Sequence, residues 1–164
     1  MNSAFRWPLR VYYEDTDAGG IVFYANYLKF FERARTEWLR TAGISQQMLS
    51  NETGCIFVVK NSSIDYHAPA KLDDSLEISV QVKKLGRASV EFIQEAWSTN
   101  HREPVHLCTG SVRVGCVDKI SMRPVQIPST VFQQISRASQ AMTAVPAQAP
   151  GHSDTPLSSL EDQP

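Results

Sequence analysis

The pattern of apolar and polar positions takes on a helical period once in the first half of the chain, between about residues 24 and 42. Large apolar side chains recur there at helical spacing, and charged residues fill most of the remaining positions. The spacing predicts one long amphipathic helix over 24–42, which Gly43 is well placed to end. The apolar stripe consists of Tyr27, Phe30, Phe31, Ala34 and Trp38.

Elsewhere, apolar and polar residues alternate with a period of two, which predicts strands. The alternation is cleanest over 76–83, where Leu, Ile and Val are interleaved with Glu, Ser, Gln and Lys. Pro8 lacks an amide donor, so the first strand is expected at a sheet edge or at a strand start. A change of phase near Gly110–Ser111 predicts a bulge in the last strand. The remaining predicted strands cover 5–13, 55–60 with a continuation to about 66, 88–97 and 105–117.

The order of these elements is one strand, one long helix and then four strands joined largely by short turns. Such an order predicts an α+β fold with an antiparallel sheet. One helix covers only one face of a sheet, so a five-stranded sheet wrapped around this helix, the hot-dog arrangement, satisfies the burial requirement. Its exposed edges are expected to need a second copy of the chain.

The domain is predicted to span residues 1–137, with a short terminal helix over about 128–137. Residues 138–164 are rich in Pro, Ser and Ala and poor in bulky apolar side chains, which predicts a disordered tail outside the core. A length of 164 residues is that of one domain with its own core.

Composition narrows the function. The 16 Lys and Arg nearly balance the 17 Asp and Glu, so an anionic ligand must be held by a local basic cluster, and nucleic-acid binding has no support. The first residues lack an apolar segment after a basic start, so no secretory signal is expected, and the sequence contains no run of about 18 apolar residues. The three cysteines are widely spaced and form no CxxC pair, which predicts neither a disulfide framework nor a zinc site, and fits a reducing cytoplasm.

The candidate chemistry lies just before the long helix. Asp17 occupies a loop that contains Gly19 and Gly20, and the helix starts a few residues later. A helix N-terminus presents unpaired amides and a partial positive charge, which favour an anion or a developing oxyanion. A carboxylate beside such amides provides the two parts that acyl transfer requires, a base or nucleophile and an electrophilic pocket.

This stretch resembles the active-site signature of the 4-hydroxybenzoyl-CoA thioesterase family. It is most similar to the YbgC branch, acyl-CoA thioesterases associated with the Tol–Pal system. The resemblance covers about residues 10–128. Its most specific part is the pattern Thr16-Asp17, Gly20-Ile21-Val22 and Asn26-Tyr27.

The resemblance implies that Asp17 is the catalytic carboxylate and that the backbone amide of Tyr24 polarises the thioester carbonyl. YbgC-like chains commonly have His where this chain has Tyr24, so a role for an imidazole is absent, whereas the amide role tolerates the change. Gly20 and Asn26 are candidate substrate-binding residues. Their alternative interpretations are relief of backbone strain for the glycine, and a helix cap or a local hydrogen-bonding role for the asparagine.

CoA carries phosphates, so Lys and Arg are expected near the mouth of the site. Lys83, Lys84 and Arg87 cluster at one predicted turn and are the candidates, with a solvated turn as the alternative interpretation. The resemblance further implies no metal or redox cofactor, a homodimer or homotetramer, and CoA bound along a subunit interface.

The predicted function is hydrolysis of an acyl-CoA to the free acid and CoA, with Asp17 as nucleophile or general base. The acyl group stays open. An acyl-thioester dehydratase is disfavoured because no His occurs between Met1 and Asp65. The other alternative is a non-catalytic acyl-thioester-binding or scaffold module of an envelope-associated complex, in contact with inner-membrane proteins.

Overall fold

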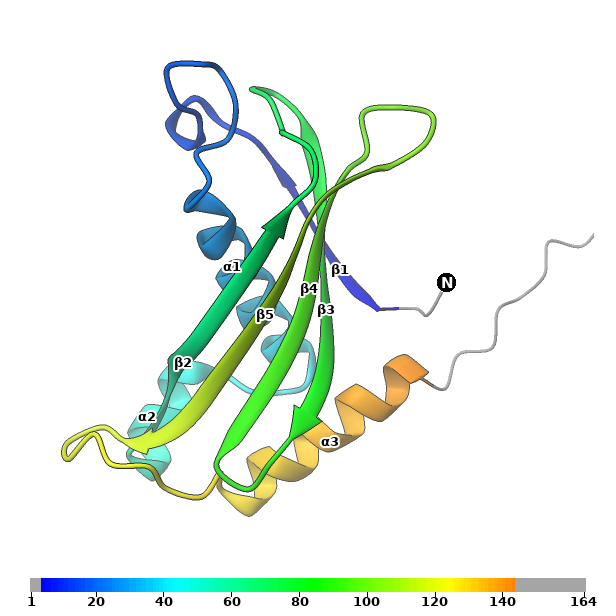
Figure 1. The fold of residues 1–164 in the computed structure, drawn as a ribbon. Helices are drawn as coiled ribbons and strands as arrows, with labels where there is room; N and C mark the ends of the chain where they lie inside the picture. Colours follow the sequence, from blue (N-terminus) through cyan, green and yellow to red (C-terminus); the bar gives the residue numbers. More distant parts are fainter. Residues whose placement is uncertain (1–3, 144–164) are drawn as a thin grey trace, which may run out of the picture.

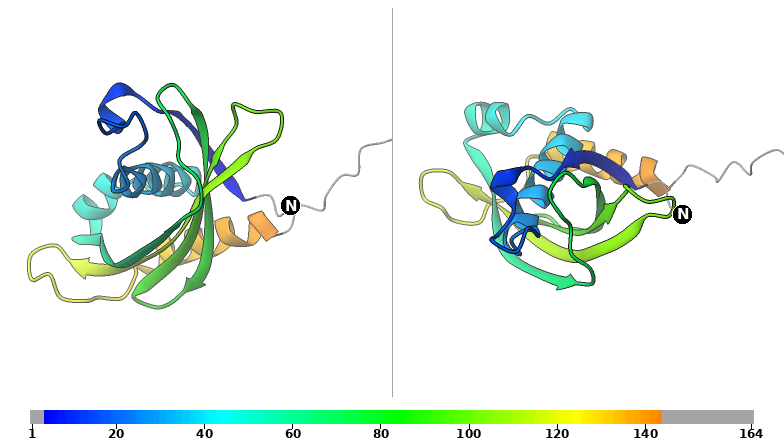
Figure 2. Two further views of the ribbon diagram at one scale, coloured as in Figure 1. Left: turned by 45° about the horizontal axis from the view of Figure 1, so that its top comes forward. Right: turned by 90° about the horizontal axis from the view of Figure 1, so that it is seen from above.

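The computed structural model describes residues 4–143, which form a single five-stranded antiparallel sheet and three α-helices. The strand order is β1-β3-β4-β5-β2, so β1 and β2 are the edges. The sheet curves around helix α1 (Asn26–Thr41), as Figures 1 and 2 show. The strands are β1 (Phe5–Arg10), β2 (Cys55–Tyr66), β3 (Ser75–Leu85), β4 (Ser89–Ser98) and β5 (Val105–Asp118).

Helix α1 forms because its apolar stripe has one face of the sheet to cover. The side chains of Phe30, Phe31, Ala34 and Trp38 are all at most 2% exposed. The helix ends where Gly43 adopts a φ of 83°, and the amides of Gly43 and Ile44 bond back into the last turn. The predicted α+β sheet around one apolar helix is therefore confirmed.

Helix α1 packs tightly against the sheet at Gly110. A Cβ atom added to this glycine would lie 2.3 Å from the ring of Phe31, so the missing side chain makes room for that ring. The predicted bulge at Gly110–Ser111 is wrong, because Ile93 and Gln94 pair with Ser111 and Gly110 without a shift. The shift falls earlier, where Ala96 pairs with Cys108 but Trp97 pairs with His106.

The first strand is shorter than predicted. β1 ends at Arg10, and a turn of 3-10 helix at Tyr13–Asp15 replaces the expected strand residues. The cause is local, since the amide of Tyr12 bonds to the carboxylate of Asp15 at 2.8 Å instead of joining the sheet.

Two further helices close the lower end of the fold. α2 (Gln46–Thr53) follows Ser45, whose hydroxyl accepts a bond from the amide of Met48. α3 (Ser129–Thr143) buries Val131 and Ile135 in the core. It runs six residues past the predicted domain end at 137, so the residues over 138–143 are helical, and the rest of the predicted tail lies outside the described residues. Within residues 4–143, no helix is long and apolar enough to cross a membrane.

Replacing Gly110 by alanine should lower the free energy of unfolding by about 1–3 kcal/mol, because the new methyl group overpacks against the ring of Phe31. Urea denaturation measures the change. Gly115→Ala is the matched control on the same strand. Its Cβ would meet only the flexible stem of Lys60, which can swing aside, so little or no loss is expected. Equal losses in the two variants would contradict this account of Gly110.

Candidate active site

The loop between β1 and α1 is anchored by Asp15, the more buried of its two aspartates. Its side chain is 7% exposed and accepts a bond from the amide of Tyr12. Its backbone carbonyl accepts two more, from the amide of Phe23 at 2.9 Å and from Nδ2 of Asn26 at 2.8 Å. Asp15 therefore ties the loop to the start of α1, in the turn and capping role that its type favours.

Asp17, two residues later, is exposed at the tip of the same loop. Its Oδ1 accepts a bond from the amide of Gly19 at 2.8 Å. The turn closes through the Asp17 amide, which donates to Ile21 at 2.9 Å, and through the Gly20 amide, which donates to Asp17 at 3.0 Å. Within the described residues, Oδ2 accepts no hydrogen bond and forms no ion pair, so this oxygen is free to act on a ligand.

Both loop glycines have a backbone reason to be there. Gly20 adopts a φ of 77°, which strains any other residue, although a Cβ there would meet nothing within 4 Å. A Cβ on Gly19 would lie 3.1 Å from Oδ1 of Asp17 and so would crowd the carboxylate. The open space beside Gly20 permits close approach of a ligand. Contact between Gly20 and the substrate stays a prediction.

The start of α1 presents the amide expected of an oxyanion site. The Phe23 amide is already bonded to Asp15, and the Asn26 amide to the carbonyl of Phe23 at 2.8 Å. Within the described residues, the amide of Tyr24 has no hydrogen-bond acceptor. The amide of Tyr24 is thus a free donor between the hydrogen-bonded amides of Phe23 and Asn26. It follows Asp17, which has the free carboxylate oxygen, in the same loop.

Aromatic rings surround this helix start. The hydroxyl of Tyr66, at the end of β2, donates to the carbonyl of Tyr24 at 2.8 Å, and its ring lies 5.7 Å from that of Tyr27. Burial, with a smaller contribution from Cys108, raises the pKa of Tyr27 to about 12. Burial also raises the pKa of Tyr66 above its ordinary value, so both phenols are protonated at neutral pH and Tyr66 can donate. Tyr66 lies within the stretch that the family resemblance covers, but the sequence suggested no role for it.

Asn26 uses its side-chain nitrogen within the protein, since Nδ2 bonds to the carbonyl of Asp15. That bond gives it a local structural role, as its alternative interpretation held, although the helix cap itself is Ala25. Direct contact between Asn26 and substrate stays a prediction.

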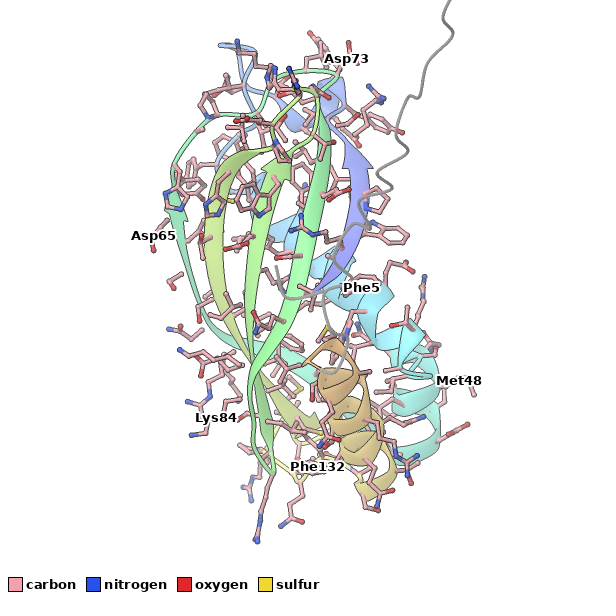
Figure 3. The ribbon with its side chains drawn as sticks, turned by 90° about the vertical axis from the view of Figure 1, so that its right-hand side faces the viewer. Phe5, Met48, Asp65, Asp73, Lys84 and Phe132 are labelled. Carbon is pink, nitrogen blue, oxygen red and sulfur yellow. The ribbon has the colours of Figure 1, made fainter. Side chains whose placement is uncertain are left out.

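The basic residues predicted to hold CoA lie far from Asp17 within one chain. Lys83, Lys84 and Arg87 gather at the turn between β3 and β4, at the lower end of Figure 1, whereas the Asp17 loop forms the upper end. Figure 3 shows the same separation between Lys84 and Asp73, which lies on the loop side. Nζ of Lys83 pairs with Glu91 at 3.0 Å, and this bond lowers the pKa of Glu91.

A cavity of about 300 Å³ lies between α1 and the first half of β2. Its walls are mainly apolar, and neither Asp17 nor Tyr24 lines it. The guanidinium of Arg35 does, although the side chain is only 8% exposed. Arg35 was not among the residues predicted to have a function. The signal in the sequence was that an arginine follows Phe31 by four residues, which places it beside the apolar stripe of the helix.

Comparison with known proteins agrees with this fold. Residues 19–105 match the thioesterase superfamily. The acyl-CoA thioesterase YbgC of Haemophilus influenzae is 47% identical over 131 residues, which cover 80% of this chain and 93% of the relative. The acyl-CoA thioester hydrolase YbgC of Escherichia coli O6:H1 is 44% identical over 138 residues, which cover 84% and 100%.

Among solved structures, a probable thioesterase from Bartonella henselae superposes with a TM-score of 0.66 at 30% identity, covering 77% of this chain and 100% of the other. An antiparallel sheet wrapped around one apolar helix is the hot-dog fold. The chain belongs to the thioesterase superfamily, and within it to the YbgC-like thioester hydrolases.

Replacing Asn26 by alanine should lower the free energy of unfolding by about 1 kcal/mol, because the bond between the helix start and the Asp15 carbonyl is lost. Thermal or urea denaturation measures it. Asn51→Ala is the control, since Asn51 is exposed on α2 and takes part only in a 3.4 Å bond to Gln47. An Asn26 variant as stable as the control would show that this bond does not hold the loop.

Proposed function

We propose that the protein hydrolyses acyl-CoA thioesters to the free acid and CoA. The observation that carries this proposal is that one loop presents both a free carboxylate oxygen, on Asp17, and an unpartnered amide, at Tyr24, while Asp15 fixes that loop to the helix. The relatives' names, acyl-CoA thioesterase and acyl-CoA thioester hydrolase, support the same substrate class.

Two routes fit this arrangement. In the first, the Asp17 carboxylate attacks the thioester carbon, CoA leaves as the thiolate and takes up a proton, and water then cleaves the mixed anhydride to the acid and Asp17. In the second, Asp17 takes a proton from water, whose oxygen attacks the carbon, and the leaving thiolate takes the proton. In both, the carbonyl oxygen becomes an oxyanion that the Tyr24 amide stabilises, by about 3 kcal/mol for one well-placed donor.

A second copy of the chain is needed to enclose the reaction, because one protomer leaves Asp17 exposed. Exposed apolar side chains surround the loop, with Tyr13 84%, Tyr24 64% and Tyr66 48% accessible. The neighbouring edge strand β2 is twelve residues long and pairs only with β5. Both features are typical of surfaces that a partner covers. We therefore propose a homodimer, or a homotetramer built from two such pairs.

Pairing of copies also accounts for the distant basic cluster. If the β2 edges pair antiparallel about a two-fold axis, the upper end of one protomer lies beside the lower end of the other. Lys83, Lys84 and Arg87 of one chain would then approach the Asp17 site of its partner and hold the CoA phosphates. Their positive charges suit phosphate, and the free cysteines of the described chain suit a reducing cytoplasm.

A scaffold role in an envelope complex is a second role that such an enzyme can carry. No feature of the described residues favours it over catalysis, and the free carboxylate of Asp17 favours catalysis. A stable complex with inner-membrane proteins, formed equally by an inactive variant, would support a separate scaffold role.

Asp17→Asn should lower kcat by about a hundredfold or more, because the amide is neither a base nor a nucleophile, while folding and CoA binding persist. Released thiol measures the rate, and calorimetry measures CoA binding. Asp73→Asn is the matched control, since Asp73 is exposed at the same end and its φ of 67° suits asparagine. Near wild-type turnover in the Asp17 variant would defeat the assignment.

Lys84→Glu and Arg87→Glu should each raise KM for an acyl-CoA by about tenfold, because they replace a phosphate partner by a repelling charge. The same acyl group on N-acetylcysteamine lacks the phosphates, so its KM should not change. Arg102→Glu, in the exposed loop between β4 and β5, controls for net charge. Equal effects on both thioesters would place the phosphates elsewhere.

A further inference from the structure

Arg35 is a buried cation without an acidic partner. It projects from the middle of α1, and its Nη1 donates to Oε1 of Gln94 at 2.8 Å. No carboxylate of the described residues lies within ion-pair distance of the guanidinium, and Glu32, one turn earlier, acts on it only at longer range. A buried charge is costly to leave unpaired. The protein alone therefore leaves this charge incompletely compensated.

Gln94 holds Arg35 in place but cannot neutralise it. Gln94 is fully buried, and its Nε2 donates to the carbonyls of Phe31 at 3.0 Å and Ser79 at 3.4 Å. These bonds orient its Oε1 toward the guanidinium. Because both helix and sheet fix the glutamine, the guanidinium position is fixed as well, which is the condition for recognising a ligand rather than merely attracting one.

Arg35 has hydrogen-bond donors left over beside the cavity between α1 and β2. A guanidinium has five N–H groups, and only the bond to Gln94 is formed within the described residues. Among these residues, Ser98 Oγ is the only fully inaccessible side-chain nitrogen or oxygen without a partner, so the unbonded nitrogens of Arg35 keep some accessible surface. Because Arg35 lines the cavity, these nitrogens are the donors that it can offer to a ligand there.

The cavity has the shape and lining of a site for an acyl chain. Its volume of about 300 Å³ holds about ten groups of the size of a water molecule. Leu39, Phe57, Val90, Phe92 and Val114 supply apolar walls, and Arg35 is the one buried polar residue of the lining. The other polar residues that line the cavity are the exposed Glu32 and Gln46 and the half-buried Thr36. Mainly apolar walls with a few polar groups are typical of small-molecule sites.

We propose that this cavity receives the acyl group of the substrate and that Arg35 selects acyl groups with a hydrogen-bond-accepting oxygen, best a carboxylate, at their far end. The inference rests on the proposed function. It adds a substrate class to it, acyl groups with an apolar body and an oxygen terminus.

The same antiparallel pairing of edges connects this cavity to the thioester. Phe57, Val58 and Val59 belong to the first half of β2, whereas Tyr66, which bonds to Tyr24, ends the strand. Antiparallel pairing places the first half of one β2 beside the second half of the other. The cavity of one protomer thus lies next to the helix start of its partner, and Arg35 is a specificity-determining residue for the partner's Asp17 site.

The test compares kcat/KM for hexanoyl-CoA, 6-hydroxyhexanoyl-CoA and adipoyl-CoA, which share a chain length and differ at the far end. The unaltered protein should prefer adipoyl-CoA to hexanoyl-CoA by about tenfold or more, with the hydroxyl compound between them, because charge-assisted hydrogen bonds are the strongest. Arg35→Met, which keeps the length of the stem, should abolish that preference and retain hydrolysis of hexanoyl-CoA. Arg35→Lys should retain part of the preference.

Arg33→Met is the matched control, since Arg33 is exposed on the same helix, and it should leave the preference unchanged. If Arg35→Met does not fold, the ratio in the unaltered protein decides alone. Hydrolysis of hexanoyl-CoA and adipoyl-CoA with equal kcat/KM overturns this inference and leaves the thioesterase proposal standing. No hydrolysis of any acyl-CoA overturns both.

Discussion

The contact between helix α1 and the concave face of the sheet fixes everything else in this molecule. Phe31 fills the space that Gly110 leaves, and Gln94 bonds the helix backbone to the same face. A helix held this closely cannot slide or rotate without breaking both contacts, because interiors are close-packed. The start of α1, and with it the Tyr24 amide, therefore has a set position relative to the sheet.

The two aspartates of the loop divide structure from chemistry. Asp15 is buried, and its carboxylate and backbone carbonyl accept hydrogen bonds from the loop and from the start of α1. Asp17 keeps one carboxylate oxygen without a hydrogen bond. Preorganised sites require a reactive atom that is free for the ligand, in a group that rigid neighbouring residues hold in place. In the single chain this side of the candidate site stays open, because Asp17 is exposed.

Periodicity was enough to predict the five strands and the long helix, whereas the roles of Asp17 and of the Tyr24 amide stay predictions. Periodicity failed where a tertiary contact decides. β1 ends early because the amide of Tyr12 bonds to the carboxylate of Asp15 instead of to the sheet. The predicted bulge is absent at Gly110 because this glycine makes room for the ring of Phe31, and the shift in register lies between Ala96 and Trp97. Lys84 and the Asp17 loop lie at opposite ends of the sheet, which depends on how the strands are arranged in three dimensions. The role proposed for Arg35 depends on a cavity. Neither feature can be derived from a pattern along the sequence.

Pro8 gives the two borders of the sheet unequal properties. β1 has six residues, lacks one backbone donor at Pro8 and carries Arg6 and Arg10, whereas the opposite border is twice as long. Proline and charge blunt a border against further hydrogen bonding. Association through edge strands is therefore self-limiting. If two molecules joined along their β2 edges, only the β1 edges would remain exposed, and these disfavour the further strand pairing that a filament needs.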